Sequence, residues 1–283
     1  MRLGIHTSTA GSLEGAALQA AELGANTFQI FSASPRMWRA RAPEPAQVRL
    51  LHAARERLDL HPLVIHAGYL INLASLDPGI RAKSIAGFRG ELERAAAIGA
   101  EYLVVHPGSY KGHTVEEGIA AFVEGLRDSA LKLDTGNVTV LLENTAGAGS
   151  HLGSRFEELH SLRKFAVAIT GVPIGFCLDT CHLLAAGFDI ASEPGLAATL
   201  HAAQQHLGLE HVHVMHANDS KGALASHLDR HANIGAGHIG DEAFRRILHH
   251  PLLRAKPFIL ETPVDEDGDD RRNLDKLKSL AAC

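Results

Sequence analysis

Cysteine is scarce in this sequence, with three residues among 283: Cys177, Cys181 and Cys283. An odd, sparse set does not suit the disulfide framework of a secreted protein, so we expect free thiols and a cytoplasmic protein. Long apolar runs are missing too, because none approaches the roughly 18 residues of a membrane span. The start MRLGIHTS enters an apolar strand without a charged leader, so we expect neither a signal peptide nor a membrane partner.

An excess of positive charge is also lacking, because 27 Lys and Arg face 32 Asp and Glu, a formal net charge of −5. The average charge therefore does not indicate a nucleic-acid-binding protein. A sequence count omits bound divalent cations, however, and three of them would bring this charge from −5 to +1. The 19 histidines make such cations worth considering. The hydrophobic fraction, 46%, is typical of a globular protein with a full core.

Short β-rich runs alternate with longer amphipathic helical runs, and no linker separates them. The predicted strands are residues 2–7, 27–32, 62–68, 102–108, 138–144, 174–180, 212–218 and 257–263. The predicted helices are residues 11–25, 45–58, 85–100, 114–133, 154–170, 195–208, 241–253 and 269–283. This alternation predicts an α/β fold, a single (β/α)8 TIM barrel over residues 1–283. An open doubly wound sheet is the rival, but GIHTSTAGS lacks its G-x-G-x-x-G turn.

Seven of the eight predicted strands end in an ionisable side chain of the type that binds metals. The strand-end residues are His6, Ser32, His66, His106, Glu143, Asp179, His216 and Glu261. In a parallel barrel these ends meet at one mouth, where active sites lie. The pattern therefore predicts a metal site at the C-terminal mouth.

Three further residues extend this set: His182 follows Asp179 by three positions, and Asp229 and His231 share the segment SHLDRHANIGAGHIG. The nine residues are too many for one ion, and histidine nitrogens with carboxylate oxygens suit zinc or manganese. The spacing of these residues along the chain does not show which of them bind the same ion. Such clusters activate water and stabilise both oxygens of a phosphoryl transfer, so phosphodiester hydrolysis is the chemistry expected.

Two pairs of residues near the site are given structural roles. His211 and His213 lie on the strand face opposite Val212, Val214 and His216, so we do not expect them at the same site. Cys177 shares strand parity with Asp179 and is predicted to point inward as a small apolar filler. Cys181 is predicted to serve packing or loop structure rather than ligation.

From about residue 1 to residue 265 the chain resembles the endonuclease IV family of apurinic/apyrimidinic endonucleases. The motifs that carry the resemblance are HAGYLINLAS, VVHPGS, LENTAGAGSHLG, GFCLDTCHLLAAGFD, HANDSK, DRHANIGAGHIG and ILETP.

The resemblance implies three zinc ions per chain, with manganese possible in part. One ion is held by His66, His106 and Glu143, and Glu143 bridges to a second. The second also takes Asp179, His216 and Glu261. The third takes His182, Asp229 and His231. Glu143 and Glu261 are the catalytic carboxylates that the resemblance implies.

The implied reaction cleaves the phosphodiester 5′ to an abasic site and leaves a 3′-hydroxyl and a 5′-deoxyribose phosphate. A hydroxide between the first two zincs attacks phosphorus, while the third stabilises the departing O3′. Removal of blocking groups from 3′ ends is also implied. The partner is double-stranded DNA with an abasic site or a blocked 3′ end, and we expect a monomer.

Arg36 and Tyr69 are, by the same resemblance, the side chains that enter the DNA helix. Lys221 is expected to contact phosphate, as Arg39 and Arg41 also could. The chain departs from the family's pattern at three positions that are not ligands: Met37, Gly68 in place of a common proline, and Tyr110 in place of a frequent histidine. Gly68 is expected to loosen the segment that presents Tyr69.

Two other functions remain open. A metal-dependent sugar isomerase or epimerase of the related barrel type normally uses one or two ions, which leaves His182, Asp229 and His231 unexplained. A non-enzymatic protein that binds DNA damage through a structural metal cluster is less favoured, because no ligand position has been lost.

Overall fold

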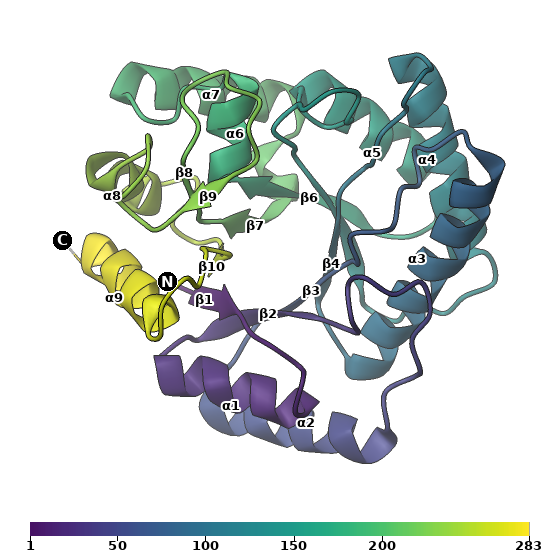
Figure 1. Ribbon diagram of the computed structural model, residues 1–283, viewed down its shortest axis with the longest axis horizontal. Coiled ribbons are helices and arrows are strands. Elements are labelled where there is room, and N and C mark those ends of the chain that lie inside the picture. The colour runs from purple at the N-terminus through teal and green to yellow at the C-terminus, as the bar shows by residue number, and fades with distance from the viewer. Residues whose placement is uncertain (283) are drawn as a thin grey trace.

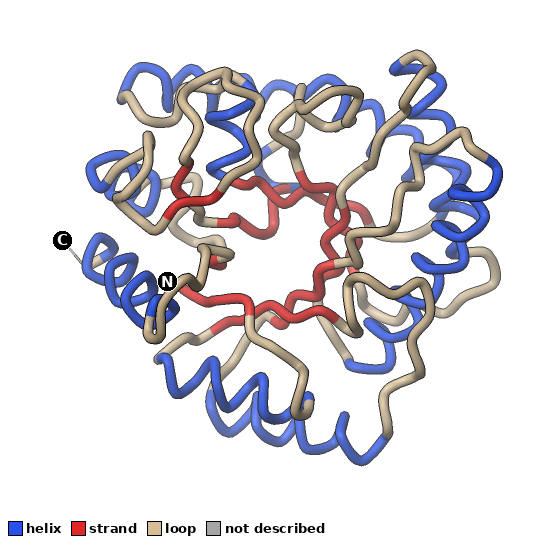
Figure 2. Tube along the Cα trace, viewed as in Figure 1, coloured by secondary structure: helices blue, strands red, loops and turns tan. Residues whose placement is uncertain are grey.

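The computed structural model describes residues 1–282, and Cys283 lies outside the described residues. Eight parallel strands close into a barrel in the order β1-β10-β7-β6-β5-β4-β3-β2. In Figure 2 the strands form a ring with the helices outside it. The barrel strands are β1 (Leu3–His6), β2 (Thr27–Phe31), β3 (Leu63–His66), β4 (Tyr102–Val105), β5 (Thr139–Glu143), β6 (Ile174–Asp179), β7 (Val212–His216) and β10 (Phe258–Leu260). The predicted TIM barrel is confirmed.

Helices cover the outside of the barrel (Figure 1). Their bounds are α1 (Leu13–Leu23), α2 (Pro45–Leu58), α3 (Pro78–Ile98), α4 (Val115–Ala130), α5 (Phe156–Thr170), α6 (Thr180–Ala186), α7 (Glu193–His206), α8 (Asp241–His249) and α9 (Asp269–Ala281), with a 3-10 turn η1 (Leu209–His211). Within residues 1–282, no helix is long and apolar enough to span a membrane.

Two helix boundaries differ from the sequence prediction by four residues or more. Helix α3 begins at Pro78 rather than residue 85, because the Asp77 side chain caps it by accepting the Ile80 N–H and proline suits the first helical position. Helix α8 ends at His249 rather than residue 253, since Pro251 disfavours helical geometry at the residue before it.

Helix α6, the turn η1 and a short ribbon were not predicted. Helix α6 begins at Thr180, where the Asp179 side chain caps it by accepting the His182 N–H. A two-stranded antiparallel ribbon, β8 (Asp219–Ser220) with β9 (His231–Ala232), lies beside α6 (Figure 1). Each strand of this ribbon has only two residues, too short for a periodic signal.

The prediction that Val212 shares a face with Val214 and His216 is wrong. In the pairing of β6 with β7, Phe176 faces Val212 and Cys177 faces Val214, so the register shifts by one residue at His213. Val212 therefore packs into the outer core, while Val214 faces the barrel interior. His213 stacks, with ring centroids 5.5 Å apart, on Tyr102, which packs against the same interior cluster as Val214, so its predicted place on the face opposite Val214 is also wrong.

Six buried apolar side chains fill the barrel interior: Val64, Val104, Leu141, Cys177, Val214 and Ile259. Each stands two positions before one of the strand-end residues His66, His106, Glu143, Asp179, His216 and Glu261. Because alternate residues of a strand share a face, this apolar layer directs all six strand-end side chains toward the same mouth. Cys177 is fully buried in the layer, which confirms its predicted inward position.

Candidate metal centre

Glu143 lies at the centre of the strand-end side chains and is fully buried. Its Oε2 is 3.1 Å from Nε2 of His66 and 3.3 Å from Nε2 of His106. Its Oε1 is 2.9 Å from Nδ1 of His216. Burial would raise the pKa of Glu143, but His106 and His216 hold it well below its ordinary value. The two oxygens of one ionised carboxylate therefore face two separate groups of residues, as a bridging ligand requires.

The side chains around Glu143 form two potential ligand groups whose ligand atoms lie within 4.8 Å of one another: one of His66, His106 and Glu143, the other of Glu143, Asp179, His216 and Glu261. Burial lowers the pKa of His106 to about 4, so its ring is neutral at neutral pH and free to bind a cation.

A third group joins His182 to Asp229 and His231. Asp229 Oδ1 lies 3.1 Å from Nε2 of His182 and 3.5 Å from Nε2 of His231. Burial opposes protonation of His182, but Asp179, Asp229 and Glu143 raise its pKa to about 10. The His182 ring, whose Nε2 lies 3.1 Å from Asp229 Oδ1, in turn lowers the pKa of Asp229 to about 2. The carboxylates of this group are thus ionised and attract positive charge.

Backbone carbonyls orient three of the rings. Nδ1 of His66 donates to the Ala67 oxygen at 2.8 Å, Nδ1 of His182 to Asn144 at 3.0 Å, and Nδ1 of His231 to Glu261 at 3.0 Å. A carbonyl only accepts, so each Nδ1 carries a proton, and Nε2 is the nitrogen that would bind a cation in place of a second proton. Among the described residues, Nε2 of His182, Nε2 of His231 and Nδ1 of His106 are buried without a hydrogen-bond partner. These orphaned nitrogens fit a cluster of cations.

Two residues that hydrogen-bond the ligand side chains, Gln29 and Asn218, were not predicted from the sequence. Oε1 of Gln29 accepts from Nε2 of His216 at 2.9 Å, and its Nε2 donates to Glu261 at 2.6 Å. Asn218 donates to Asp179 Oδ2 at 2.6 Å and accepts the Glu261 N–H at 2.8 Å. Gln29 lies mid-strand in β2 on the same face as Phe31, and neither neutral amide stands out in a search for ionisable residues.

Cys181 also lies near the third group and could be combined with Asp179 and His231. Its thiol is buried, and the pKa of the thiol is raised to about 12, mainly by burial and to a smaller extent by the negative charge of Asp179. Only the thiolate is a good metal ligand, so this raised pKa opposes ligation. Both Cys177 and Cys181 are free thiols, as expected.

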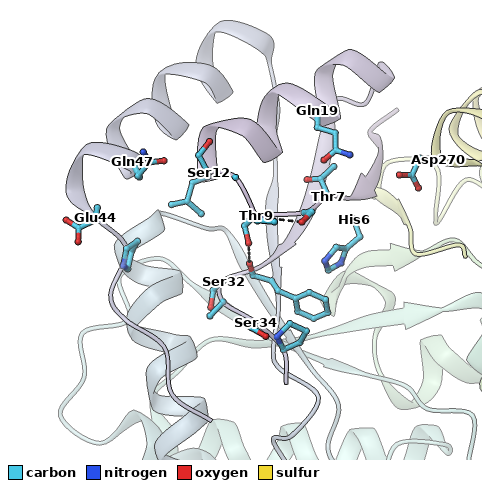
Figure 3. A pocket seen from close by; sticks show the side chains of 18 of the residues that line it. His6, Thr7, Thr9, Ser12, Gln19, Ser32, Ser34, Glu44, Gln47 and Asp270 are labelled. Atoms are coloured by element: carbon cyan, nitrogen blue, oxygen red, sulfur yellow. Dashed lines mark hydrogen bonds between the residues drawn. The ribbon is translucent and has the colours of Figure 1, made fainter. Parts of the chain in front are cut away.

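A cavity of about 380 Å³ opens over these groups, lined among others by His66, His106, His182, Asp229, His231 and Glu261. A larger cavity of about 800 Å³ adjoins it between the loops that follow β1 and β2. Figure 3 shows the larger cavity, with His6 on the side nearest the barrel and Ser32 and Ser34 among its lining side chains. His6 and Asp270 line both cavities, so the mouth is one continuous depression.

Of the side chains predicted to contact DNA, Tyr69 lines the smaller cavity. Tyr69 is 64% exposed, and its N–H donates to the Pro35 oxygen at 3.0 Å, next to the exposed Arg36. Lys221 is exposed on the loop that carries Asp229. The two loops approach closely at Gly68, where an added Cβ would lie 3.2 Å from the Pro35 oxygen.

Residues 17–282 match the family described as "Xylose isomerase-like TIM barrel". "Probable endonuclease 4" of Solibacter usitatus is 73% identical over 99% of this chain and 97% of its own length. The chain belongs to the endonuclease IV family. "Endonuclease 4" of Thermus thermophilus is 42% identical over 98% of this chain and 97% of its own length.

This chain is also similar to solved structures of barrel proteins, both inside and outside the endonuclease IV family. The crystal structure of endonuclease IV from Thermus thermophilus has a TM-score of 0.86 and 40% identity, covering 100% of this chain and 99% of that one. A D-tagatose 3-epimerase-like protein has a TM-score of 0.71 at 20% identity, covering 100% of this chain and 97% of that one, a likeness of fold alone.

Proposed function

We propose that this chain is a zinc-dependent DNA repair endonuclease that hydrolyses the phosphodiester 5′ to abasic sites. The products are a 3′-hydroxyl and a 5′-deoxyribose phosphate, and the same site removes blocking groups from 3′ ends. The observation that carries the proposal is the arrangement of nine side chains in three ligand groups, two of which share Glu143. The high identity to endonuclease 4 proteins supports the substrate.

Nine residues hold the proposed ions: His66, His106, Glu143, Asp179, His182, His216, Asp229, His231 and Glu261. Zinc bound there supplies activated water and neutralises charge on a phosphodiester. Glu143 and Glu261 are the proposed catalytic carboxylates, since both face the space where the first two groups meet. The rings of His66 and His216 beside Glu143 are buried, and electrostatic interactions are stronger in such surroundings than in water.

Arg36 and Tyr69 are proposed to enter the gap left by the abasic nucleotide, and Lys221 to contact phosphate. The Tyr69 ring lies 5.2 Å from the Phe31 ring in an edge contact, which holds it in place beside the mouth. Flipping out a damaged nucleotide costs a few kcal/mol, least where pairing is already lost. A rigid aromatic side chain can offset part of this cost by stacking.

A sugar isomerase or epimerase is the second candidate, because the fold is shared with epimerase-like proteins. One or two ions suffice for that chemistry. The complete third group of His182, Asp229 and His231 therefore favours the nuclease.

The deciding experiment incubates the purified protein with a duplex containing one tetrahydrofuran abasic analogue, without added magnesium. We expect a single nick 5′ to the lesion and about three zinc ions per chain by mass spectrometry. Glu261→Gln should abolish nicking while circular dichroism stays unchanged. An intact duplex after long incubation with zinc-loaded protein would contradict the proposal, and a metal content near one would favour the isomerase.

Tyr69 provides a separate test of the proposed DNA contact. We expect Tyr69→Ala to weaken binding of the abasic duplex by about tenfold or more, since stacking contributes roughly 1–3 kcal/mol per base. Tyr69→Phe is the matched control, because it retains the ring and should bind like the original protein. Zinc content should be the same in all three. Equal DNA affinity of the alanine variant would remove Tyr69 from the proposed contact.

A further inference from the structure

A fully buried carboxylate, Asp219, lies at the base of the loop that carries Asp229 and His231. Its two oxygens accept five backbone N–H groups. Oδ1 accepts from Ser220 at 2.8 Å and Ile239 at 2.9 Å, and Oδ2 accepts from residues 235, 237 and 240 at 3.0, 3.1 and 3.2 Å. Four of these donors belong to the segment 235–240, which follows β9. One side chain thus organises a whole turn of backbone.

The segment 235–240 is shaped to surround this carboxylate. A Cβ added at Gly237 would lie 2.5 Å from Asp219 Oδ1 and closer still to the Ser220 oxygen, so only glycine fits there. Gly235 adopts φ +81, a conformation that L side chains rarely adopt, and turns its N–H toward the carboxylate. Converging backbone N–H groups stabilise an ionised carboxylate without a basic side chain.

Asp219 is connected to the third ligand group through the ribbon of β8 and β9. Asp219 pairs with Ala232 and Ser220 pairs with His231, so the carboxylate and the His231 backbone belong to one ladder. The Lys221 N–H donates to the Arg230 oxygen at 2.9 Å and extends the pairing toward Asp229. The Asp229 side chain is 57% exposed. Its approach to His182 therefore depends on the backbone of this loop.

We propose that Asp219 is a positioning residue that shapes the backbone of residues 219–240 and thereby places Asp229 and His231 against His182 to hold one cation. The inference rests on the proposed function only in taking these three residues as ligands. Without the carboxylate, the segment 235–240 loses the acceptor of its four N–H groups, and the ribbon no longer fixes the distance between Asp229 and His182. The residues of the other two ligand groups lie at the ends of barrel strands, outside the segment 219–240.

The test compares Asp219→Asn with Asp189→Asn. Asp189 is the matched control, because its carboxylate accepts the backbone N–H groups of Ala191 and Ser192, both at 3.0 Å, outside the 219–240 segment. Both variants are loaded with zinc alone, equilibrated against a chelator buffer and analysed for zinc by mass spectrometry. Hydrogen exchange of the amides in 233–240 and the melting temperature are measured on the same samples.

In Asp219→Asn we expect the zinc affinity of the third ligand group to be about 10- to 100-fold weaker, while the other groups keep theirs. The amides of 233–240 should also lose protection from hydrogen exchange. Asp189→Asn should keep its full zinc content even if its melting temperature falls. Equal zinc content in Asp219→Asn and the original protein, or zinc loss in both variants in proportion to lost stability, would overturn the inference.

If Asp219→Asn does not fold, Gly237→Ala decides the question, since its methyl group displaces the same carboxylate. Zinc retained at full content in Gly237→Ala would also overturn the inference. The nicking assay separates this inference from the proposed function. Selective zinc loss in Asp219→Asn with no nicking by the original protein would refute the nuclease and leave the positioning role standing.

Discussion

Gln29 joins two proposed ligands through one amide, accepting from His216 and donating to Glu261. Because Nε2 of His216 donates to Gln29, Nδ1 is the nitrogen that faces Glu143 and Glu261. This choice of tautomer places the lone pair of the ring toward the proposed cation.

Replacing Gln29 with leucine removes both hydrogen bonds while roughly preserving volume. We expect the affinity for the zinc ion near His216 to fall by about 10- to 100-fold, because partners of metal ligands orient the ligands and fix their tautomers. Competition with a chelating dye measures this affinity. Gln29→Glu is the informative companion, since it keeps an acceptor for His216 but places a carboxylate against Glu261. Unchanged zinc affinity in the leucine variant would show that packing alone orients His216.

At the scale of elements, helix α3 supports the two loops that carry Arg36 and Tyr69. Glu91 and Arg94 form a buried ion pair, with 3.0 Å between Glu91 Oε1 and Arg94 Nη2. Glu91 also accepts the Ser32 hydroxyl at 2.5 Å and the Gly68 N–H at 3.4 Å. This pair therefore ties the ends of β2 and β3 to the helix behind them.

We expect Arg94→Met to lower the free energy of unfolding by about 3–5 kcal/mol, because it leaves the Glu91 charge buried without its partner. The double variant Glu91→Leu with Arg94→Met should recover part of this loss, since no buried charge remains. Urea unfolding of both single variants and the double variant gives the coupling. Strictly additive losses would mean that the two side chains do not stabilise each other.

Much of the element order could be predicted from the sequence, because each barrel strand is an apolar run bounded by turn residues. The start of α3 was missed although Asp77 and Pro78 are a recognisable cap. Helix α6 and the β8–β9 ribbon could not be predicted, because they are too short. α6 has 7 residues and each ribbon strand has 2, so neither contains enough turns or alternations to show a period.

For the whole molecule, the proposed cations couple metal binding to stability. The three ligand groups draw residues from β3, β4, β5, β6, β7 and the segments beyond them, so ions that bind there join distant parts of the chain. A ligand that binds only the folded state stabilises it by about 2.7 kcal/mol at one hundred times its dissociation constant.

We therefore expect zinc to raise the melting temperature of chelator-treated protein by about 5 °C for each ligand group that is filled at that excess. Scanning calorimetry with increasing zinc measures the shift. Magnesium is the control, because it prefers octahedral oxygen ligands and should raise the temperature much less. No zinc-dependent shift at any concentration would contradict a cation cluster in the folded protein.

The sequence by itself determined the barrel and the residue types of its mouth. Strand period places every second residue on one face, so an apolar residue such as Val64 or Leu141 implies that the residue two positions later, His66 or Glu143, points the same way. The strand-end residues that form the site were thus predictable from local patterns.

Only the tertiary structure decided how those residues combine. Which oxygen of Glu143 faces His66 and which faces His216 depends on strand register across the closed barrel, including the shift at His213. The partners Gln29, Asn218 and Asp219 bear amides or a carboxylate whose roles depend on groups far away in the chain. Local propensity carries no information about such distances, so their functions emerge only when the chain has folded.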